Sequence, residues 1–386
     1  IFYFTPFIFA DKDAIRLEEN QAFVMKNQAN VEELDTMIEY NAKFISLVKK
    51  DPIYRTMELQ KYLEGRYDTH SYEYYNLGLS FAQIDDFHSA YKYFRKAYNL
   101  DKGNKLYASM TLLSAQRVKI TIRKEEKQKI IKNLKSKNGS YHYFGQYIYR
   151  IMYDPDFVPK KEKLTNKFKK SIFYRALYFI DRVNEIGIRK DEPLLVEYYK
   201  DPLVYMFSLM ARDDKESDYQ YISRIQDSVP LTYNNIFIKG PLIITRYYLD
   251  TLKALGLLHS ATLDIETDTS ATYYRTKALV QLYNGNPKST VAIIEYLQDK
   301  YKLEDRYTYL LQAAALIEDG EIENASVTLA LAQQVLKSDS DVNFLIGMRF
   351  LQELKINSAM KNFKHPYSGE LIDFKLIGFD KFLKEL

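Results

Sequence analysis

The sequence predicts an all-α protein in which helical hairpins stack one after another. Only 13 Gly and 10 Pro occur among 386 residues, which leaves few residues for the tight turns of an all-β fold. Apolar residues recur at spacings of three and four along most of the chain, as the buried face of a helix requires. A glycine–aromatic pair followed by an alanine–aromatic pair occurs around Gly78 and again around Gly347. Hairpins that repeat in this way share one continuous core, so the chain need not divide into several ordinary domains.

Residues 1–10 form an apolar N-terminal segment without a single charge, and Asp11, Lys12 and Asp13 follow it directly. A bilayer-spanning helix needs about 20 apolar residues, so this segment cannot cross a membrane by itself. It fits the end of a membrane span or the remainder of an export signal, which predicts membrane attachment N-terminal to Ile1. Two other interpretations stay open: the segment packs on the first hairpin, or it docks in a groove.

Residues 11–118 are predicted to form the N-terminal helical hairpins. A helical pattern begins at Asp13 and stops at Asp51-Pro52, because the residue before a proline disfavours the α conformation. A second helix is expected from Pro52 to Leu63, and Gly65 is positioned to end it.

The clearest hairpin spans residues 71–104, and Lys105–Val118 has the pattern of the next helix. Gly78 and Ala90 are small residues on the two facing helices, so the helix backbones can approach closely. Between the helices, Asp85 and Asp86 are candidates to cap the second one. The larger residues of the same seam are Tyr74, Leu77, Phe81 and Phe94, and Ala97 completes the pattern.

Residues 119–242 are predicted to be degenerate helical repeats with basic runs and loops. Lysine dominates from Lys119 to Lys137, and a second basic run lies between Lys160 and Lys170. We expect both runs to be solvated helix faces, because glutamates are interspersed among the lysines. The alternative is a polyanion-binding region, Lys119–Lys170, that would take nucleic acid or anionic lipid.

Residues 243–386 return to a regular pattern and are predicted to hold C-terminal repeats and a capping helix. The last two units begin at Arg306 and Ser340, which are 34 residues apart. From Ser368 an amphipathic tail is expected to cover the apolar end of the stack. The four units span residues 243–266, 271–300, 306–339 and 340–366.

Composition and motifs argue against several classes of function. A formal net charge of +4 gives no chain-wide basic field, so no specific nucleic-acid partner is expected. The chain has no cysteine, which removes thiolate metal sites and cysteine nucleophiles and fits either the cytosol or a bacterial periplasm. The five histidines form no pair at metal-ligand spacing, and the glycine loops and serine elbow of common catalytic motifs are missing. We therefore expect a protein that is not an enzyme and needs no metal or cofactor.

Residues 71–104 resemble the tetratricopeptide repeat, a 34-residue helical hairpin, and residues 243–366 resemble it more loosely. The resemblance implies a right-handed α-solenoid, irregular in its middle, whose first helices line a concave groove for peptides or neighbouring subunits. Family members that hold a terminal carboxylate use Lys and Asn at two groove positions, where this chain has Tyr75 and Leu79. The groove candidates that the resemblance implies are Tyr72, Tyr75, Leu79, Arg275, Leu279, Phe344, Met348 and Leu351.

An apolar, aromatic groove favours a permanent protein partner over a charged peptide end. Together with the apolar start, it predicts a scaffold or adaptor of a bacterial envelope-associated assembly in the periplasm, with assembly subunits or another repeat protein as partners. A cysteine-free, Lys- and Tyr-rich solenoid behind such a start resembles the paralysed-flagellum class, periplasmic repeat proteins that build disk structures around flagellar motors of Campylobacter-type bacteria. The alternative is a cytosolic receptor for a short peptide of a regulatory partner.

Overall fold

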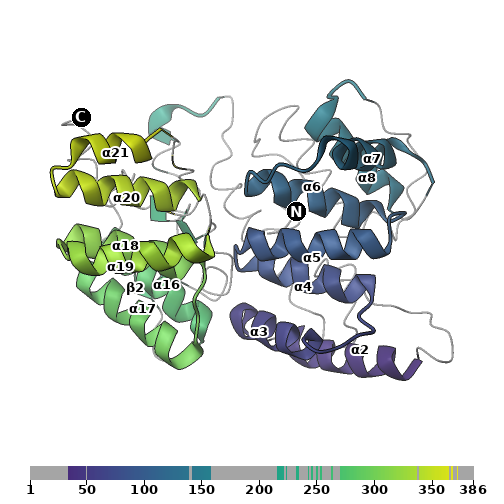
Figure 1. Ribbon diagram of the computed structural model, residues 1–386, viewed down its shortest axis with the longest axis horizontal. Helices are drawn as coiled ribbons and strands as arrows, with labels where there is room; N and C mark the ends of the chain where they lie inside the picture. The colour runs from purple at the N-terminus through teal and green to yellow at the C-terminus, as the bar shows by residue number, and fades with distance from the viewer. Residues whose placement is uncertain are drawn as a thin grey trace. The chain divides into compact units, whose positions relative to one another are not determined.

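The structure, a computed structural model, describes residues 34–48, 50–138, 141–157, 270–336 and 339–364, with isolated residues between 215 and 263 and at Tyr367 and Ile372. Across this described part the protein is all-α, as predicted, apart from one two-residue parallel pairing (Figure 1). In that pairing β1 (Thr232–Tyr233) lies against β2 (Thr262–Leu263). The chain divides into two compact units, Ile1–Tyr221 and Ile222–Leu386.

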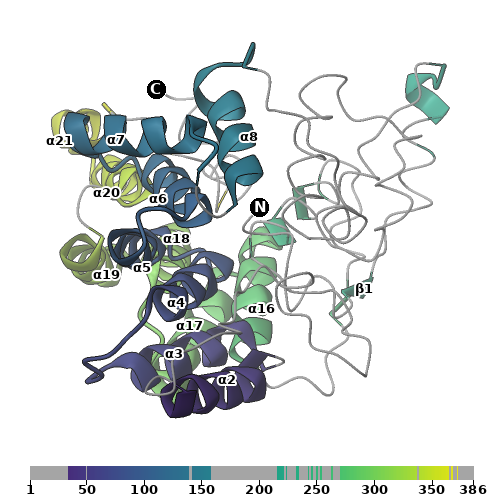
Figure 2. The same cartoon turned by 90° about the vertical axis from the view of Figure 1, so that its right-hand side faces the viewer.

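The N-terminal unit is a series of helices in which each packs against its neighbour in the chain (Figures 1 and 2). Helix α3 begins and ends where the sequence predicted, and α4–α5 is the predicted hairpin at residues 71–104. Helix α6 also contacts α8, the second helix after it. The helices are α2 (Leu34–Val48), α3 (Pro52–Leu63), α4 (Ser71–Gln83), α5 (Phe87–Leu100), α6 (Lys105–Arg117), α7 (Lys124–Lys135) and α8 (His142–Tyr153).

The C-terminal unit contains three hairpins in its described part. Within each hairpin the two helices pack together, and the first helices of consecutive hairpins also touch, α16 against α18 and α18 against α20. The hairpins are α16 (Ala271–Tyr283) with α17 (Pro287–Tyr301), α18 (Arg306–Asp319) with α19 (Ile322–Val335), and α20 (Ser340–Gln352) with α21 (Ile356–Asn362).

One turn geometry closes the first helix of five hairpins. A residue with positive φ stands fourteen positions after the first residue of α4, α6, α16, α18 and α20. The amide of the following residue donates to a carbonyl five positions back at 2.8–3.0 Å, which is the hydrogen bond of a Schellman motif. The turn residues are Asp85 (φ 66°), Lys119 (φ 55°), Gly285 (φ 72°), Gly320 (φ 84°) and Leu354 (φ 57°).

Leu354 occupies this left-handed position at a cost that glycine would avoid, because a Cβ atom disfavours such a backbone by about 1–2 kcal/mol. Its side chain is 83% exposed, so little packing is lost on its removal. Leu354→Gly should therefore raise the free energy of unfolding by about 1 kcal/mol, measured by urea titration. Gly320→Ala, the reverse change at the equivalent turn, should lower it by a similar amount, and a neutral pair of results would contradict the account.

The hairpin seam is built on a glycine facing a phenylalanine. A Cβ atom added to Gly78 would lie 2.8 Å from Phe94 Cδ1, and one added to Gly347 would lie 2.5 Å from Phe363 Cε1. Both pairs are sixteen residues apart. At the equivalent positions of the hairpins α16–α17 and α18–α19 the first residue is alanine and the second is aliphatic, in the pairs Ala278 with Ile294 and Ala313 with Leu329.

Polar contacts join consecutive hairpins at a nearly constant separation along the chain. Asn76 Nδ2 donates to Tyr40 Oη at 3.0 Å, and Gln352 Nε2 donates to the carbonyl of Ile317 at 2.9 Å. These and four further contacts connect residues 30–36 positions apart, about the length of one hairpin. Each unit therefore contains polar contacts between residues of consecutive hairpins.

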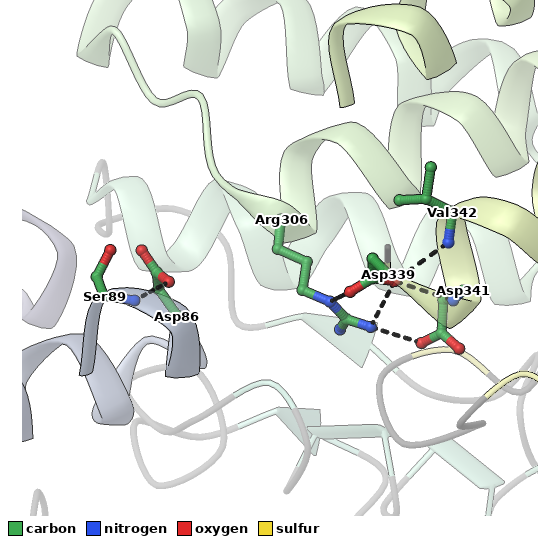
Figure 3. Close-up of polar contacts among 6 residues, drawn as sticks. All are labelled: Asp86, Ser89, Arg306, Asp339, Asp341 and Val342. Atoms are coloured by element: carbon green, nitrogen blue, oxygen red, sulfur yellow. Dashed lines mark hydrogen bonds and ion pairs between the residues drawn. The ribbon is translucent and has the colours of Figure 1, made fainter. Parts of the chain in front are cut away.

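The second helix of the clearest hairpin is capped as predicted. The carboxylate of Asp86 accepts a hydrogen bond from the Ser89 amide at 3.0 Å, a contact drawn in Figure 3.

Several other predictions fall outside the described residues and stay predictions. They concern the apolar segment 1–10, the basic run 160–170, most of residues 171–266, and the capping helix expected from Ser368.

Candidate protein-binding surface

The predicted groove residues lie mainly inside the packed helices. Seven of the eight are buried, and Leu351 is half-buried. Partner binding along the first helices stays a prediction. The large apolar side chains that are exposed on α19, described below, lie on a second helix. The seven buried candidates are Tyr72, Tyr75, Leu79, Arg275, Leu279, Phe344 and Met348.

In the N-terminal unit these candidates connect neighbouring helices. The ring of Tyr75 lies 5.6 Å from that of Phe94 and 5.1 Å from that of Tyr107, measured between centroids, and so joins α4 to α5 and α6. Tyr72 meets Tyr40 of α2 edge-on at 5.4 Å. Aromatic pairs at such distances stabilise packing beyond the area that they bury.

In the C-terminal unit two of the candidates also connect neighbouring elements, Arg275 through an ion pair and a ring contact and Phe344 through ring contacts. Arg275 Nη1 lies 2.6 Å from Asp305 Oδ2, at the start of α18, and its guanidinium lies 4.8 Å from the centroid of the Tyr307 ring. The Phe344 ring lies 5.5 Å from Phe363 and 4.5 Å from Tyr367. Both side chains hold a helix against the segment that follows it.

The strongest polar cluster of the described residues joins α18 to α20 (Figure 3). Arg306 Nε donates to Asp339 Oδ2 at 2.6 Å, and Arg306 Nη2 donates to Asp339 Oδ1 at 3.2 Å and to Asp341 Oδ2 at 2.8 Å. Asp339 also caps α20, because its Oδ1 accepts from the amides of Asp341 at 2.9 Å and Val342 at 3.2 Å. The guanidinium fork fits this bidentate geometry, which an ammonium group could not reproduce.

Burial and charge act against each other in this cluster. Burial tends to raise the pKa of Asp339, but the Arg306 guanidinium and two backbone amides outweigh it and hold that pKa below its ordinary value. Burial tends to lower the pKa of Arg306, and the two carboxylates raise it instead. The Asp339 carboxylate is therefore ionised and is neutralised by an arginine, which suits a structural role better than acid–base chemistry.

Metal-binding and membrane-spanning features are not found among the residues that the structure describes. No group of three or more His, Asp or Glu side chains in those ranges could hold a metal ion. None of the described helices is both long enough and apolar enough to cross a bilayer.

The exposed positions of the second helices differ in character from one hairpin to the next. Counted from the helix start, the same positions of α5, α17 and α19 face away from the first helix. They are basic in α5, with Lys92 and Lys96, and mixed in α17, with Glu295 and Lys300. In α19 they are apolar or uncharged, and we call them the α19 outer face: Val327, Ala330, Leu331, Gln334 and Val335.

The α19 outer face exposes large apolar side chains in a single stripe. Val327 is 63% exposed, Leu331 46% and Val335 57%, and their four-residue spacing puts them on one side of the helix. The opposite side of α19 is buried through Ala325, Leu329 and Ala332. An apolar stripe outside the core, on a helix whose core side is already filled, is typical of an interaction surface.

The groove candidates do not include this surface, although the sequence contains a signal for it. Residues 324–336 carry no Asp, Glu, Lys or Arg, although a second helix should have a charged outer side. The groove candidates came from the first helices, where the apolar residues serve the contacts between helices.

Comparison with known proteins gave no relative. No protein-family model and no curated protein matches the chain. Its function therefore has to be argued from its own residues.

Proposed function

We propose that the protein is a non-enzymatic scaffold or adaptor that binds other proteins within a large bacterial envelope-associated assembly. The observation that carries the proposal is the α19 outer face, where three large apolar side chains are exposed along a helix with no charge beyond Glu323. A protein partner that covers this stripe would remove apolar area from water, which is the usual driving force of such association.

The proposal includes a repeat architecture of tetratricopeptide type in which the hairpins stack into a right-handed α-solenoid. It is supported by the motif of residues 71–104, by the recurring Schellman turn, and by polar contacts that repeat at about the length of one hairpin. A solenoid of this kind offers its groove, its outer helices and its ends to several partners at once.

An envelope location is proposed from the apolar residues 1–10, and the absence of cysteine is compatible with it. A flagellar-motor assembly is one narrower case of this class. The competing proposal is a cytosolic receptor for a short peptide, and it would use the groove rather than the α19 outer face.

The test is to tag the intact protein in its own cells and to compare the proteins that copurify with it. Leu331→Glu puts a charge into the middle of the stripe and should abolish copurification of a stoichiometric partner. Glu295→Arg also places a new charged side chain on the outer side of a second helix, α17, and should leave the partner bound. Both variants should unfold at the same urea concentration as the parent protein, since both positions are exposed.

Two outcomes would count against the proposal. If Leu331→Glu retained every partner, the α19 outer face would not be the partner-binding surface. A single cytosolic partner that competes with a short peptide would favour the receptor.

A further inference from the structure

Positive charge is concentrated in one stretch of the chain. Residues 87–138 contain 14 Lys and Arg against 3 Asp and Glu, a net charge of +11, whereas the whole chain carries +4. Residues 270–364 contain 11 of each and are neutral. The excess therefore belongs to one part of the N-terminal unit, helices α5 to α7 and their connections.

The fold joins the two halves of this stretch into one surface. Arg95 of α5 makes a bidentate pair with Glu126 of α7, with Nε at 3.0 Å and Nη2 at 2.8 Å from the two carboxylate oxygens. Farther along, Asn133 Nδ2 donates to the carbonyl of Lys102 at 2.9 Å. These two contacts connect α7 to α5 and to the residues that follow it, while α6 packs against both helices.

We call this region the basic surface and define it by six exposed lysines. On α7 the buried residues are Ile130 and Leu134, and lysines on the remaining sides of the helix are exposed, with Lys135 Nζ lying 4.4 Å from the centroid of the Tyr149 ring. On α5 the exposed lysines stand opposite Ala90, Phe94 and Ala97 in the same way. The six lysines are Lys92, Lys96, Lys124, Lys129, Lys132 and Lys135.

The types of side chain on the basic surface limit the class of partner that it can recognise. Arg95 is committed to Glu126, and the guanidinium of Arg117 lies 5.0 Å from the centroid of the Phe87 ring. Apart from Arg123, the exposed cations of this stretch are lysines, which act as point charges and lack the guanidinium fork. Among the described residues of this stretch no large aromatic side chain is exposed, so no platform for stacking of single-stranded bases is present.

The basic surface also includes one exposed apolar side chain. Leu100 follows Lys92 and Lys96 at four-residue intervals and is 59% exposed, so an apolar side chain accompanies the lysines on α5. Lysines with an apolar side chain beside them are typical of binding to an anionic bilayer.

We propose that the basic surface of α5 and α7 binds an anionic phospholipid membrane. The lysine ammonium groups contact headgroup phosphates, and Leu100 enters the boundary between headgroups and acyl chains. This contact lies on helices other than α19, so the membrane and a protein partner occupy different surfaces of the chain.

The experiment measures cosedimentation of the full chain with vesicles of phosphatidylglycerol and phosphatidylcholine, and with vesicles of phosphatidylcholine alone. We expect binding only to the first kind, and loss of that binding in about 1 M salt, where the Debye length falls to about 3 Å. Lys124→Glu/Lys129→Glu/Lys132→Glu should weaken binding at least about 100-fold, since it reverses three charges of the surface.

A matched control makes the same change in net charge on the C-terminal unit. Lys288→Glu/Lys300→Glu/Lys361→Glu alters three exposed lysines and should bind the anionic vesicles almost as well as the parent protein. If the two triple variants lost vesicle binding equally, the net charge of the chain rather than the basic surface would explain the binding, and the proposal would be overturned. Tighter binding to an RNA duplex than to the anionic vesicles would overturn it as well and assign the surface to nucleic acid.

Discussion

Replacing Arg306 by Met should lower the free energy of unfolding by about 3–5 kcal/mol, because the buried carboxylates of Asp339 and Asp341 would lose the guanidinium that neutralises them. Side-chain exposure is 14% for Arg306, 7% for Asp339 and 1% for Asp341, so water cannot take over the role of the guanidinium. Urea titration with a fluorescence or circular-dichroism readout measures the change.

Two comparison variants separate the charge from its geometry. Arg306→Lys keeps the charge but loses the bidentate contact to Asp339, and it should fall between the parent protein and Arg306→Met. Asp299→Ala removes an ion pair whose side chains are 91% and 77% exposed, and it should change stability by less than about 0.5 kcal/mol. A loss below about 1 kcal/mol in Arg306→Met would show that the cluster is not a strong link between α18 and α20.

The same cluster predicts a pH dependence with a definite sign. The folded state holds the pKa of Asp339 below its ordinary value of 3.8, so the unfolded chain binds the proton more tightly. The stability that this carboxylate contributes is therefore fully present above about pH 5 and is lost as the pH falls through the ordinary pKa toward the lowered one. Arg306→Met removes the cause of the lowered pKa, so the difference between variant and parent should shrink between pH 7 and pH 3.

Local signals in the sequence were enough to place the hairpins. Pro52 and Gly65 bound α3 because one fixes a helix start and the other adopts a left-handed backbone, here with φ of 84°. Gly78 and Ala90 mark the seam because only small residues permit that approach. These effects act within a few residues or within one hairpin, so they can be predicted without the rest of the fold.

Whether the groove candidates meet a partner depends on more than a single hairpin. Tyr75 has the position that the family resemblance gives to the groove, but the space beside it is filled by Tyr107 of the next hairpin at 5.1 Å between ring centroids. Helical spacing shows that Tyr75 shares a side with its neighbours. It does not show whether that side meets a partner or another helix of the same chain.

The two surfaces proposed for binding were visible only in part. The charge-free run 324–336 and the lysine run 119–137 can both be seen in the sequence, but their outward direction depends on which side each helix buries. The lysines of α5 and α7 are about thirty residues apart in the chain, and contacts such as the pair of Arg95 with Glu126 bring them together.

Gly78→Ala should lower the free energy of unfolding by about 1–2 kcal/mol, although alanine is the better helix former. The new methyl group would lie 2.8 Å from Phe94 Cδ1, and overpacking of this kind costs about 1–3 kcal/mol, of which helix propensity returns about 1 kcal/mol. Phe94 is fully buried, so its ring cannot move aside into solvent.

The chain itself indicates the rescue. Where the first helix has Ala278 or Ala313 in place of glycine, the facing position has Ile294 or Leu329 in place of phenylalanine. In a Phe94→Leu background, Gly78→Ala should therefore be neutral or stabilising, which gives a coupling energy of about 2 kcal/mol in a double-mutant cycle. Strictly additive effects would mean that the Gly78 and Phe94 side of the seam has room for a methyl group, and the size match between the two positions would then be coincidental.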